Sequence, residues 1–268
     1  MGNIRLTIAA AVGLLALGVS GAEAADAKKD WGIYQSKERR SGYTYMTDET
    51  RAMQDDPFQN PGMLWLETGK ELWDKVDGKA GKSCASCHGA PEKMKGLATV
   101  YPKYDEKLKN IINIENRINQ CRTERMDAKA WKYDSKELLA TTVLVRHQSL
   151  GMRMNVSVDG PAQPFFQKGR DFYYKRRGQL DLACANCHGD YPGGQLRANV
   201  LSQGQTNGFP LYRLKWQKVG SVHRRFKGCN DMVRAEPYKV GGQEYLNLEL
   251  YTAWRGRGLP VETPAVRN

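Results

Sequence analysis

The chain has 268 residues, a formal net charge of +12, six cysteines and 40% hydrophobic residues. Such a charge attracts anions or an acidic partner, but no helix-turn-helix, zinc-finger or RNP pattern supports nucleic-acid binding. No segment offers the run of about 20 uncharged apolar residues that a membrane span needs. We therefore expect a protein of two small domains with no nucleic-acid partner and no membrane insertion.

The first residues have the pattern of a secretory signal. Arg5 precedes an apolar run over residues 6–19, and the small-residue motif Ala-Glu-Ala ends at Ala24. The apolar run is too short to span a bilayer. We expect residues 1–24 to be a signal peptide that is cleaved near Ala24, and the mature protein to be periplasmic.

Four of the six cysteines lie in two C-x-x-C-H motifs. They comprise Cys84, Cys87 and His88 in the first motif, and Cys184, Cys187 and His188 in the second. Two thiols one helical turn apart can add to the vinyl groups of a haem, and the next histidine can bind its iron. A redox dithiol, half of a zinc site or a disulfide could explain one copy. Two copies behind an export signal predict two covalently bound haem c groups, with the histidines as proximal ligands.

The two halves of the chain repeat one pattern. The sequence Gly-Lys-Glu-Leu-Trp begins at Gly69 and Gly-Arg-Asp-Phe-Tyr begins at Gly169, each fifteen residues before a haem cysteine. These segments are typical of the N-terminal helix of small cytochromes c, whose glycine lets another helix approach closely. Apolar stretches that begin at Leu138 and Leu246 are the expected crossing helices.

This repeat predicts a mainly α fold of two tandem cytochrome c-type domains related by internal duplication. The predicted parts are the signal peptide at residues 1–24, an N-terminal extension at 25–60, a first domain at 61–157 and a second domain at 158–268. The sequence leaves open whether the extension wraps a domain or contacts a partner.

The two remaining cysteines occupy equivalent places in the repeat. Arg117 stands four residues before Cys121, as Arg225 does before Cys229. Both cysteines follow their haem motif at the distance where a distal ligand belongs, so we predict that each is an axial thiolate. A Cys121–Cys229 disulfide is one alternative in an oxidising compartment. The other possible distal ligands are Met126, Met232, His147 and His223, and for the two histidines we favour an ordinary structural or solvent role.

Basic residues are denser around the second of these cysteines. The segment from His223 to Asn230 reads His-Arg-Arg-Phe-Lys-Gly-Cys-Asn, and Arg234 follows it. Nearby positive charge favours thiolate over thiol, and arginine binds oxyanions in bidentate fashion. A solvated face of a basic protein would look similar, but the expected haem favours a site. We therefore predict that Cys229 is a nucleophile beside a binding site for a small divalent anion.

These residues together resemble the SoxA family, the dihaem catalytic subunits of the SoxAX cytochromes of bacterial sulfur oxidation. Besides both haem motifs, the resemblance rests on RSGY at 40–43, RAMQDDPFQNPG at 51–62 and RRFKGCN at 224–230. It implies that one haem has His88 and Cys121 as axial ligands, and the other His188 and Cys229. It also implies that Cys229 is the active-site residue, which can carry a persulfide, and that Arg225 binds the substrate.

The resemblance implies the activity of an L-cysteine S-thiosulfotransferase. Thiosulfate would be joined to a cysteine of the SoxYZ carrier protein, and two electrons would pass through the second haem to the small subunit SoxX of a heterodimer, and then to cytochrome c. A dihaem electron carrier without chemistry of its own is the alternative from another class. A thiosulfate oxidase that forms tetrathionate is a third, and it would need no carrier protein.

Overall fold

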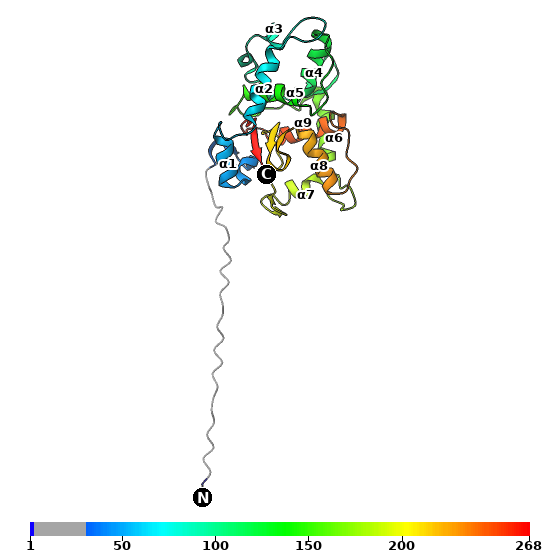
Figure 1. The fold of residues 1–268 in the computed structure, drawn as a ribbon. Helices are drawn as coiled ribbons and strands as arrows, with labels where there is room; N and C mark the ends of the chain where they lie inside the picture. Colours follow the sequence, from blue (N-terminus) through cyan, green and yellow to red (C-terminus); the bar gives the residue numbers. More distant parts are fainter. Residues whose placement is uncertain (3–30) are drawn as a thin grey trace. The chain divides into compact units, whose positions relative to one another are not determined.

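The computed structural model describes residues 1–2 and 31–268, and the latter form a single compact unit. The predicted signal peptide falls mostly on residues 3–30 and so lies outside the described residues. Helices dominate the described part (Figure 1). The α-helices are α1 (Asp48–Asp55), α2 (Met63–Asp74), α3 (Cys84–His88), α4 (Ile114–Arg125), α5 (Lys136–His147), α6 (Gln163–Tyr174), α7 (Cys184–His188), α8 (Val222–Met232) and α9 (Gln243–Arg255). The predicted mainly α class is confirmed.

Short 3-10 helices and strands connect these helices. The 3-10 helices are η1 (Gly32–Tyr34), η2 (Gly42–Tyr45), η3 (Pro91–Met94), η4 (Leu97–Val100), η5 (Gly160–Ala162) and η6 (Leu214–Trp216). The strands are β1 (Gln35–Ser36), β2 (Arg39–Arg40), β3 (Lys103–Asp105), β4 (Asn110–Ile112), β5 (Gln195–Leu196), β6 (Asn199–Val200), β7 (Leu211–Arg213), β8 (Lys218–Gly220) and β9 (Ala265–Arg267). Consecutive strands pair as antiparallel hairpins, and β7 also pairs with β9 in parallel.

The same order of elements occurs twice. A long helix, a five-residue haem-motif helix, a hairpin and two more helices occur in this order as α2, α3, β3–β4, α4 and α5, and again as α6, α7, β7–β8, α8 and α9, where the second half has the additional hairpin β5–β6 after α7. Each of these hairpins begins just after a cis proline, Pro102 or Pro210. The helices therefore lie where the repeated sequence predicts them.

Glycines permit the close helix crossings that the sequence predicts. Helix α2 packs on α5, and α6 packs on α9. A Cβ atom at Gly69 would lie 2.4 Å from the backbone oxygen of Ala140, and one at Gly169 would lie 2.0 Å from that of Asn247. Because real Cβ atoms do not approach an oxygen so closely, only glycine fits at these two crossings.

Side-chain caps fix where α4, α5 and α8 begin. The side chains of Asn113, Ser135 and Ser221 each accept a hydrogen bond from a backbone N–H in the first turn of the helix that follows. Such caps satisfy a donor that has no partner within the helix. For α8, the cap sets the phase of the helix and thus the direction in which Cys229 points.

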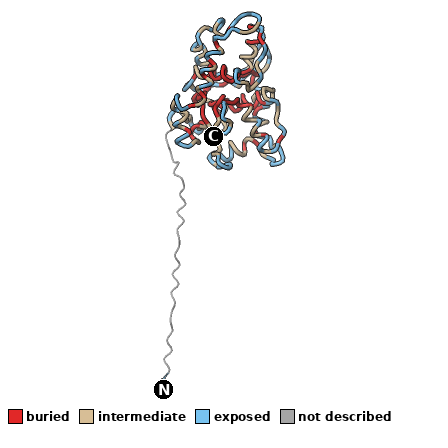
Figure 2. Tube along the Cα trace, in the orientation of Figure 1, coloured by how far each residue is buried: buried red, intermediate tan, exposed pale blue. Residues whose placement is uncertain are grey.

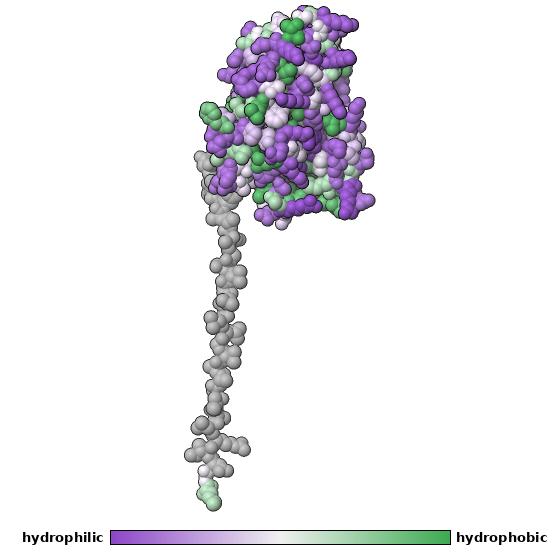
Figure 3. Space-filling view, in the orientation of Figure 1, coloured by the Kyte–Doolittle hydropathy of each residue, from purple (hydrophilic) through white to green (hydrophobic). Residues whose placement is uncertain are grey.

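Buried residues are concentrated where the two halves meet (Figure 2). The larger apolar cluster includes Leu139 and Leu144 of α5 together with Leu246 and Leu250 of α9. Both halves therefore contribute to one core. A smaller cluster around Tyr173, Leu248 and Tyr251 lies in the second half alone. In the view of Figure 3, hydrophilic side chains dominate the surface. Within residues 31–268, no helix combines the length and apolar character that crossing a membrane would require.

The described part of the N-terminal extension packs against the second half. Asn60 Nδ2 donates to the backbone oxygen of Pro264 at 2.9 Å, and Gln54 Oε1 accepts from the backbone N–H of Val266 at 3.1 Å. Arg39 donates to the backbone oxygen of Arg257 at 3.1 Å. The described residues of the extension thus contact the second half at several places, and the backbone oxygen of Ile33 also accepts from Arg153 at 3.1 Å.

A buried polar network joins the two halves. His223 Nδ1 accepts from the backbone N–H of Gly241 at 3.0 Å, so the proton of the neutral ring is on Nε2, which donates to Glu249 at 2.9 Å. Asn113 Nδ2 donates to the same Glu249 oxygen at 2.8 Å. The ring of Tyr133 stacks on His223 at 5.1 Å. Helix α8 is therefore held at its first turn by residues of the first half.

Candidate active site

The second haem motif and α8 bring four predicted site residues together. Helix α7 supplies Cys184, Cys187 and His188, and α8 supplies Cys229, all of them half-buried. The thiol of Cys229 lies within hydrogen-bonding contact of the His188 imidazole and close enough to Cys184 and Cys187 to raise the pKa of both thiols. The predicted distal ligand therefore faces the predicted proximal ligand.

Neighbouring loops orient the imidazole of His188. Its Nδ1 lies 2.7 Å from the backbone oxygen of Ser202, which can only accept a hydrogen bond, so Nδ1 carries the proton. The other nitrogen, Nε2, is then free to act as a ligand. Gly204 lies against the ring, because a Cβ atom there would come within 2.9 Å of His188 Cγ. Gly204 also has a φ of +75°, which glycine adopts without strain.

Cations surround the sulfur of Cys229. Burial by itself raises the pKa of this thiol, but the charge of Arg225, the hydrogen bond and charge of His188, and the charge of Arg213 outweigh burial and lower the pKa to about 7. These charges therefore favour the thiolate over the thiol at Cys229. The thiolate is the nucleophilic form of cysteine.

Arg225 is free to bind an anion. It lies four residues before Cys229 on α8, so the two side chains share one face of the helix. Among residues 31–268, its guanidinium forms no ion pair and no side-chain hydrogen bond with another residue. Its position and its lack of an acidic partner fit the predicted substrate-binding role.

The first haem motif forms a similar but more exposed arrangement. Ser83 and Ser86 cap α3 reciprocally, with Ser86 Oγ 2.9 Å from the backbone nitrogen of Ser83. Cys87 and His88 are exposed, and the ring of His88 lies 5.8 Å from that of Trp73. The thiol of Cys121, on α4, lies close enough to Cys84 and Cys87 for their charges to interact. The four predicted residues of this site are thus also brought together.

Cys121 differs from Cys229 in its electrostatic surroundings. Burial raises the pKa of Cys121, and the charges of Arg117 and Arg125, which act in the opposite direction, do not reverse the shift. The two cysteines occupy equivalent places in the repeat, yet only Cys229 has its pKa lowered. The surroundings therefore favour the thiolate at Cys229 and the thiol at Cys121.

These two groups of residues fit covalent haem. In each, two thiols are one turn apart on a short helix, a histidine follows, and a third thiol comes from a different helix. At the second site, the bond from His188 to Ser202 leaves Nε2 as the nitrogen available to iron. Histidine and thiolate are both axial ligands of haem iron in proteins.

The alternative distal ligands differ in their surroundings. The side chain of Met232 is exposed and that of Met126 is buried. His147 Nδ1 is hydrogen-bonded at 3.0 Å to the backbone oxygen of Thr263, and His223 is held in the buried network between the halves. All six cysteines, which lie within the described residues, are free thiols in this structure.

The sequence did not point to several residues of the site. Arg213 is on β7, sixteen residues before Cys229, and Ser202 and Gly204 are in the loop after β6. These residues approach Cys229 and His188 only through the chain fold. Their sequence neighbourhood carries no motif that would have revealed them.

Comparisons with known proteins identify the family. The family described as SoxA/TsdA, cytochrome c domain, matches residues 68–154. The chain is 49% identical over 232 residues to the L-cysteine S-thiosulfotransferase subunit SoxA of Rhodovulum sulfidophilum, a match that covers 86% of this chain and 81% of that protein. The chain belongs to the SoxA family. The resemblance seen in the sequence is confirmed.

Other SoxA proteins support the same assignment. The SoxA subunit of Paracoccus pantotrophus is 44% identical over 228 residues, which covers 85% of this chain and 79% of that protein. The crystal structure of SoxXA from P. pantotrophus matches with a TM-score of 0.84 at 44% identity and covers 86% of this chain and 87% of that chain. Since cytochrome c domains hold haem covalently, this SoxA-family chain carries covalently bound haem c.

Proposed function

We propose that this chain is the catalytic subunit that joins thiosulfate to a cysteine of the SoxYZ carrier protein and passes two electrons to cytochrome c. The names of its relatives as L-cysteine S-thiosulfotransferase subunits support this activity. The observation that carries it is the position of Cys229, whose pKa is about 7, beside the unpaired guanidinium of Arg225. An electron carrier without chemistry would need neither feature.

The proposed reaction uses Cys229 as the sulfur nucleophile. Arg225 binds the oxygen atoms of thiosulfate and directs the terminal sulfur toward the Cys229 thiolate. A sulfur–sulfur bond forms, two electrons leave, and Cys229 carries an S-thiosulfonate group. The carrier thiolate then attacks the sulfur next to Cys229, which releases Cys229 as thiolate and leaves the S-thiosulfonate on the carrier. A haem held by Cys184, Cys187 and His188 would supply a one-electron acceptor beside Cys229 for these two electrons.

We further propose that the chain carries two haem c groups, one in each half. Residues 61–157 would hold the first and residues 158–268 the second. The attachment residues would be Cys84, Cys87, Cys184 and Cys187, with axial ligands His88, Cys121, His188 and Cys229. The placement of these residues in two similar groups supports the proposal. A periplasmic heterodimer with SoxX is the proposed setting, since the matched crystal structure bears the name SoxXA.

Replacement of Cys229 by alanine tests the function. In the heterodimer, Cys229→Ala should lower carrier-dependent cytochrome c reduction with thiosulfate by about a thousandfold or more, because the nucleophile is lost. Cys121→Ala is the matched control, since the pKa of Cys121 is raised and the proposed reaction does not use this thiol. Haem content and absorption spectra of both variants would show that the haem is retained.

The outcomes separate the candidate functions. Retention of sulfur transfer in Cys229→Ala would contradict the proposal. If the wild-type protein reduces cytochrome c and forms tetrathionate without the carrier, the chain is a thiosulfate oxidase instead. A wild-type protein that exchanges electrons but forms no sulfur product would be an electron carrier.

A further inference from the structure

We propose that Arg213 is a second anion-binding residue of the active site and that, together with Arg225, it holds a divalent sulfur oxyanion beside Cys229. This inference rests on the proposed function and specifies the recognition of its substrate. The sequence repeat does not reveal the residue, because Arg213 comes from a strand and not from the helix that carries Cys229 and Arg225.

The sheet of the second half fixes the backbone at Arg213. This residue ends β7, where it pairs with Lys218 of β8 on one side and with Arg267 of β9 on the other. Its Nε donates to the backbone oxygen of Asn268 at 2.5 Å. Arg213 is therefore held by hydrogen bonds on both sides of its strand and at one of its three guanidinium nitrogens.

An aromatic side chain connects Arg213 to the helix of the active site. The guanidinium carbon of Arg213 lies 5.1 Å from the ring centre of Trp216, and that of Arg224, on α8, lies 4.7 Å from the same ring. Such cation–π contacts orient a guanidinium without neutralising its charge. Since Arg225 follows Arg224 directly, the Trp216 contacts place Arg213 beside the first turns of α8.

The charges of Arg213 and Arg225 oppose each other. Burial, followed by the charge of Arg225, lowers the pKa of Arg213 to about 10, while Cys229 acts in the opposite direction. Both arginines are half-buried, and among residues 31–268 neither forms an ion pair with a carboxylate side chain. Two partly buried cations repel each other, and an anion bound between them would relieve this repulsion.

The chemistry of thiosulfate fits this pair. Thiosulfate carries two negative charges and three oxygen atoms. One arginine would balance only one of these charges, whereas two arginines would balance both. A carboxylate of the bound haem offers the same chemistry from a second source. The two sources can be distinguished, because the loss of a haem contact changes the haem, whereas the loss of a substrate contact changes the affinity for the substrate.

The test uses the heterodimer with both haems in place, the carrier protein and cytochrome c. In Arg213→Gln, the KM for thiosulfate should rise about tenfold to a hundredfold, the range of one lost charge-assisted hydrogen-bonded contact. Inhibition by inorganic sulfate should weaken by a similar factor, while the KM for the carrier protein should stay within about twofold of wild type. Arg213→Lys should recover part of the affinity, because lysine keeps the charge but not the planar fork.

Lys218→Gln is the matched control. Lys218 pairs with Arg213 across the hairpin and carries the same charge, but it is exposed. Its replacement should leave the KM for thiosulfate within about twofold of wild type, since exposed charges interact weakly.

Three results would overturn the inference. One is that Arg213→Gln leaves both the KM for thiosulfate and the inhibition by sulfate unchanged. Another is an equal rise in Lys218→Gln, which would mean that general charge and not a specific contact attracts the anion. The third is a shift of the haem potential or spectrum in Arg213→Gln without a change in KM, which would assign Arg213 to the haem. If Cys229→Ala also retains transfer, the proposed function itself fails, so the two failures are distinguishable.

Discussion

Single residues give two equivalent cysteines different electrostatic surroundings. Cys121 and Cys229 follow the same sequence pattern, but their pKa values shift in opposite directions. Cys229 has the His188 imidazole and two arginine charges around it, which together outweigh burial. Around Cys121, burial prevails over the nearby arginines. The local field and not the motif therefore favours Cys229 over Cys121 as the nucleophile of the proposed reaction.

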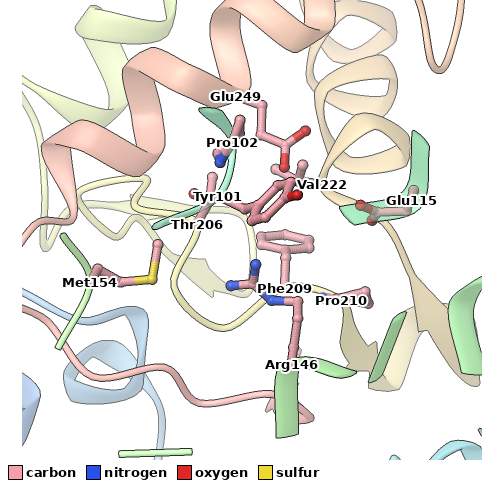
Figure 4. A pocket seen from close by; sticks show the side chains of 10 residues that line it. All are labelled: Tyr101, Pro102, Glu115, Arg146, Met154, Thr206, Phe209, Pro210, Val222 and Glu249. Carbon is pink, nitrogen blue, oxygen red and sulfur yellow. The ribbon is translucent and has the colours of Figure 1, made fainter. Parts of the chain in front are cut away.

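A buried carboxyl at the junction of the halves gives the stability of the protein a pH dependence. Glu115 lines a cavity of about 10 Å³ with Arg146 and Glu249, as Figure 4 shows. Burial and then the charge of Glu249 raise the pKa of Glu115 to about 8, although Arg146 acts in the opposite direction. Burial and the nearby Glu249 therefore favour the protonated form of Glu115, while Glu249 accepts hydrogen bonds from His223 and Asn113.

The sign of this pH dependence follows from the raised pKa. Between pH 4.5 and about 8, folded Glu115 keeps a proton that the unfolded chain releases, so the free energy of unfolding falls as the pH rises. Glu115→Gln removes this effect. We expect the melting temperature of the variant to exceed that of wild type by a few degrees at pH 8, on the order of 2–4 °C per kcal/mol. At pH 5 the difference should be smaller.

Thermal unfolding followed by circular dichroism at both pH values would measure the difference. Glu92→Gln is the control, because Glu92 is exposed. Parallel melting curves for Glu115→Gln and wild type across this pH range would contradict the assignment of a protonated Glu115.

At the scale of elements, α8 carries the two residues of the proposed sulfur chemistry. Ser221 caps α8, and His223 fixes its first turn through Glu249, so Arg225 and Cys229 present one face toward α7. Helix α6 packs on α9 and leads into α7, so this crossing also positions the second haem motif. The position of the active-site residues thus depends on how closely α6 and α9 can approach.

Gly169→Ala should weaken this crossing. The added Cβ would lie 2.0 Å from the backbone oxygen of Asn247, so the helices must separate. Overpacking of this kind costs about 1–3 kcal/mol of folding free energy. Arg170→Ala is the control, because Arg170 is exposed on the same helix, and it should change stability by less than about 0.5 kcal/mol. Equal urea midpoints for the two variants would show that the crossing tolerates a methyl group.

At the scale of the whole molecule, two similar halves share one core. Residues of α5 and α9 belong to the same buried cluster, and the network of Asn113, His223 and Glu249 joins the halves with hydrogen bonds. Each half nevertheless forms its own group of cysteine and histidine residues. The molecule thus joins two haem-motif sites through one shared apolar core, an arrangement that supports the proposal of two haem groups.

Intact mass spectrometry of the mature protein under nonreducing conditions tests the haem number. We expect a mass that corresponds to two covalent haems, because each half presents two thiols in a haem motif. A variant with Cys84→Ser and Cys87→Ser should lose the mass of one haem and keep the other. Peptide mapping would also locate any added sulfur on Cys229. A wild-type mass with a single haem would contradict the proposed pair.

The sequence by itself determined the haem motifs, the helices and the Arg225–Cys229 pair. Haem attachment depends on residues within one helical turn, and Arg225 and Cys229 are one turn apart on α8, so both signals are local. Gly69 and Gly169, at the two helix crossings, were also predictable, because each begins the same short sequence pattern fifteen residues before a haem cysteine. For this reason most of the helical fold and the predicted ligand sets could be read from the chain.

Only the tertiary structure decided what surrounds Cys229. Arg213, Ser202 and Gly204 come from loops and a three-residue strand, which are too short to leave a periodic signal in the sequence. The pairing of His223 with Glu249 joins residues that are 26 positions apart. Charges and hydrogen bonds act through space, whereas sequence patterns report on neighbours along the chain. The identity of the reactive cysteine therefore depends on contacts that form only when the chain folds.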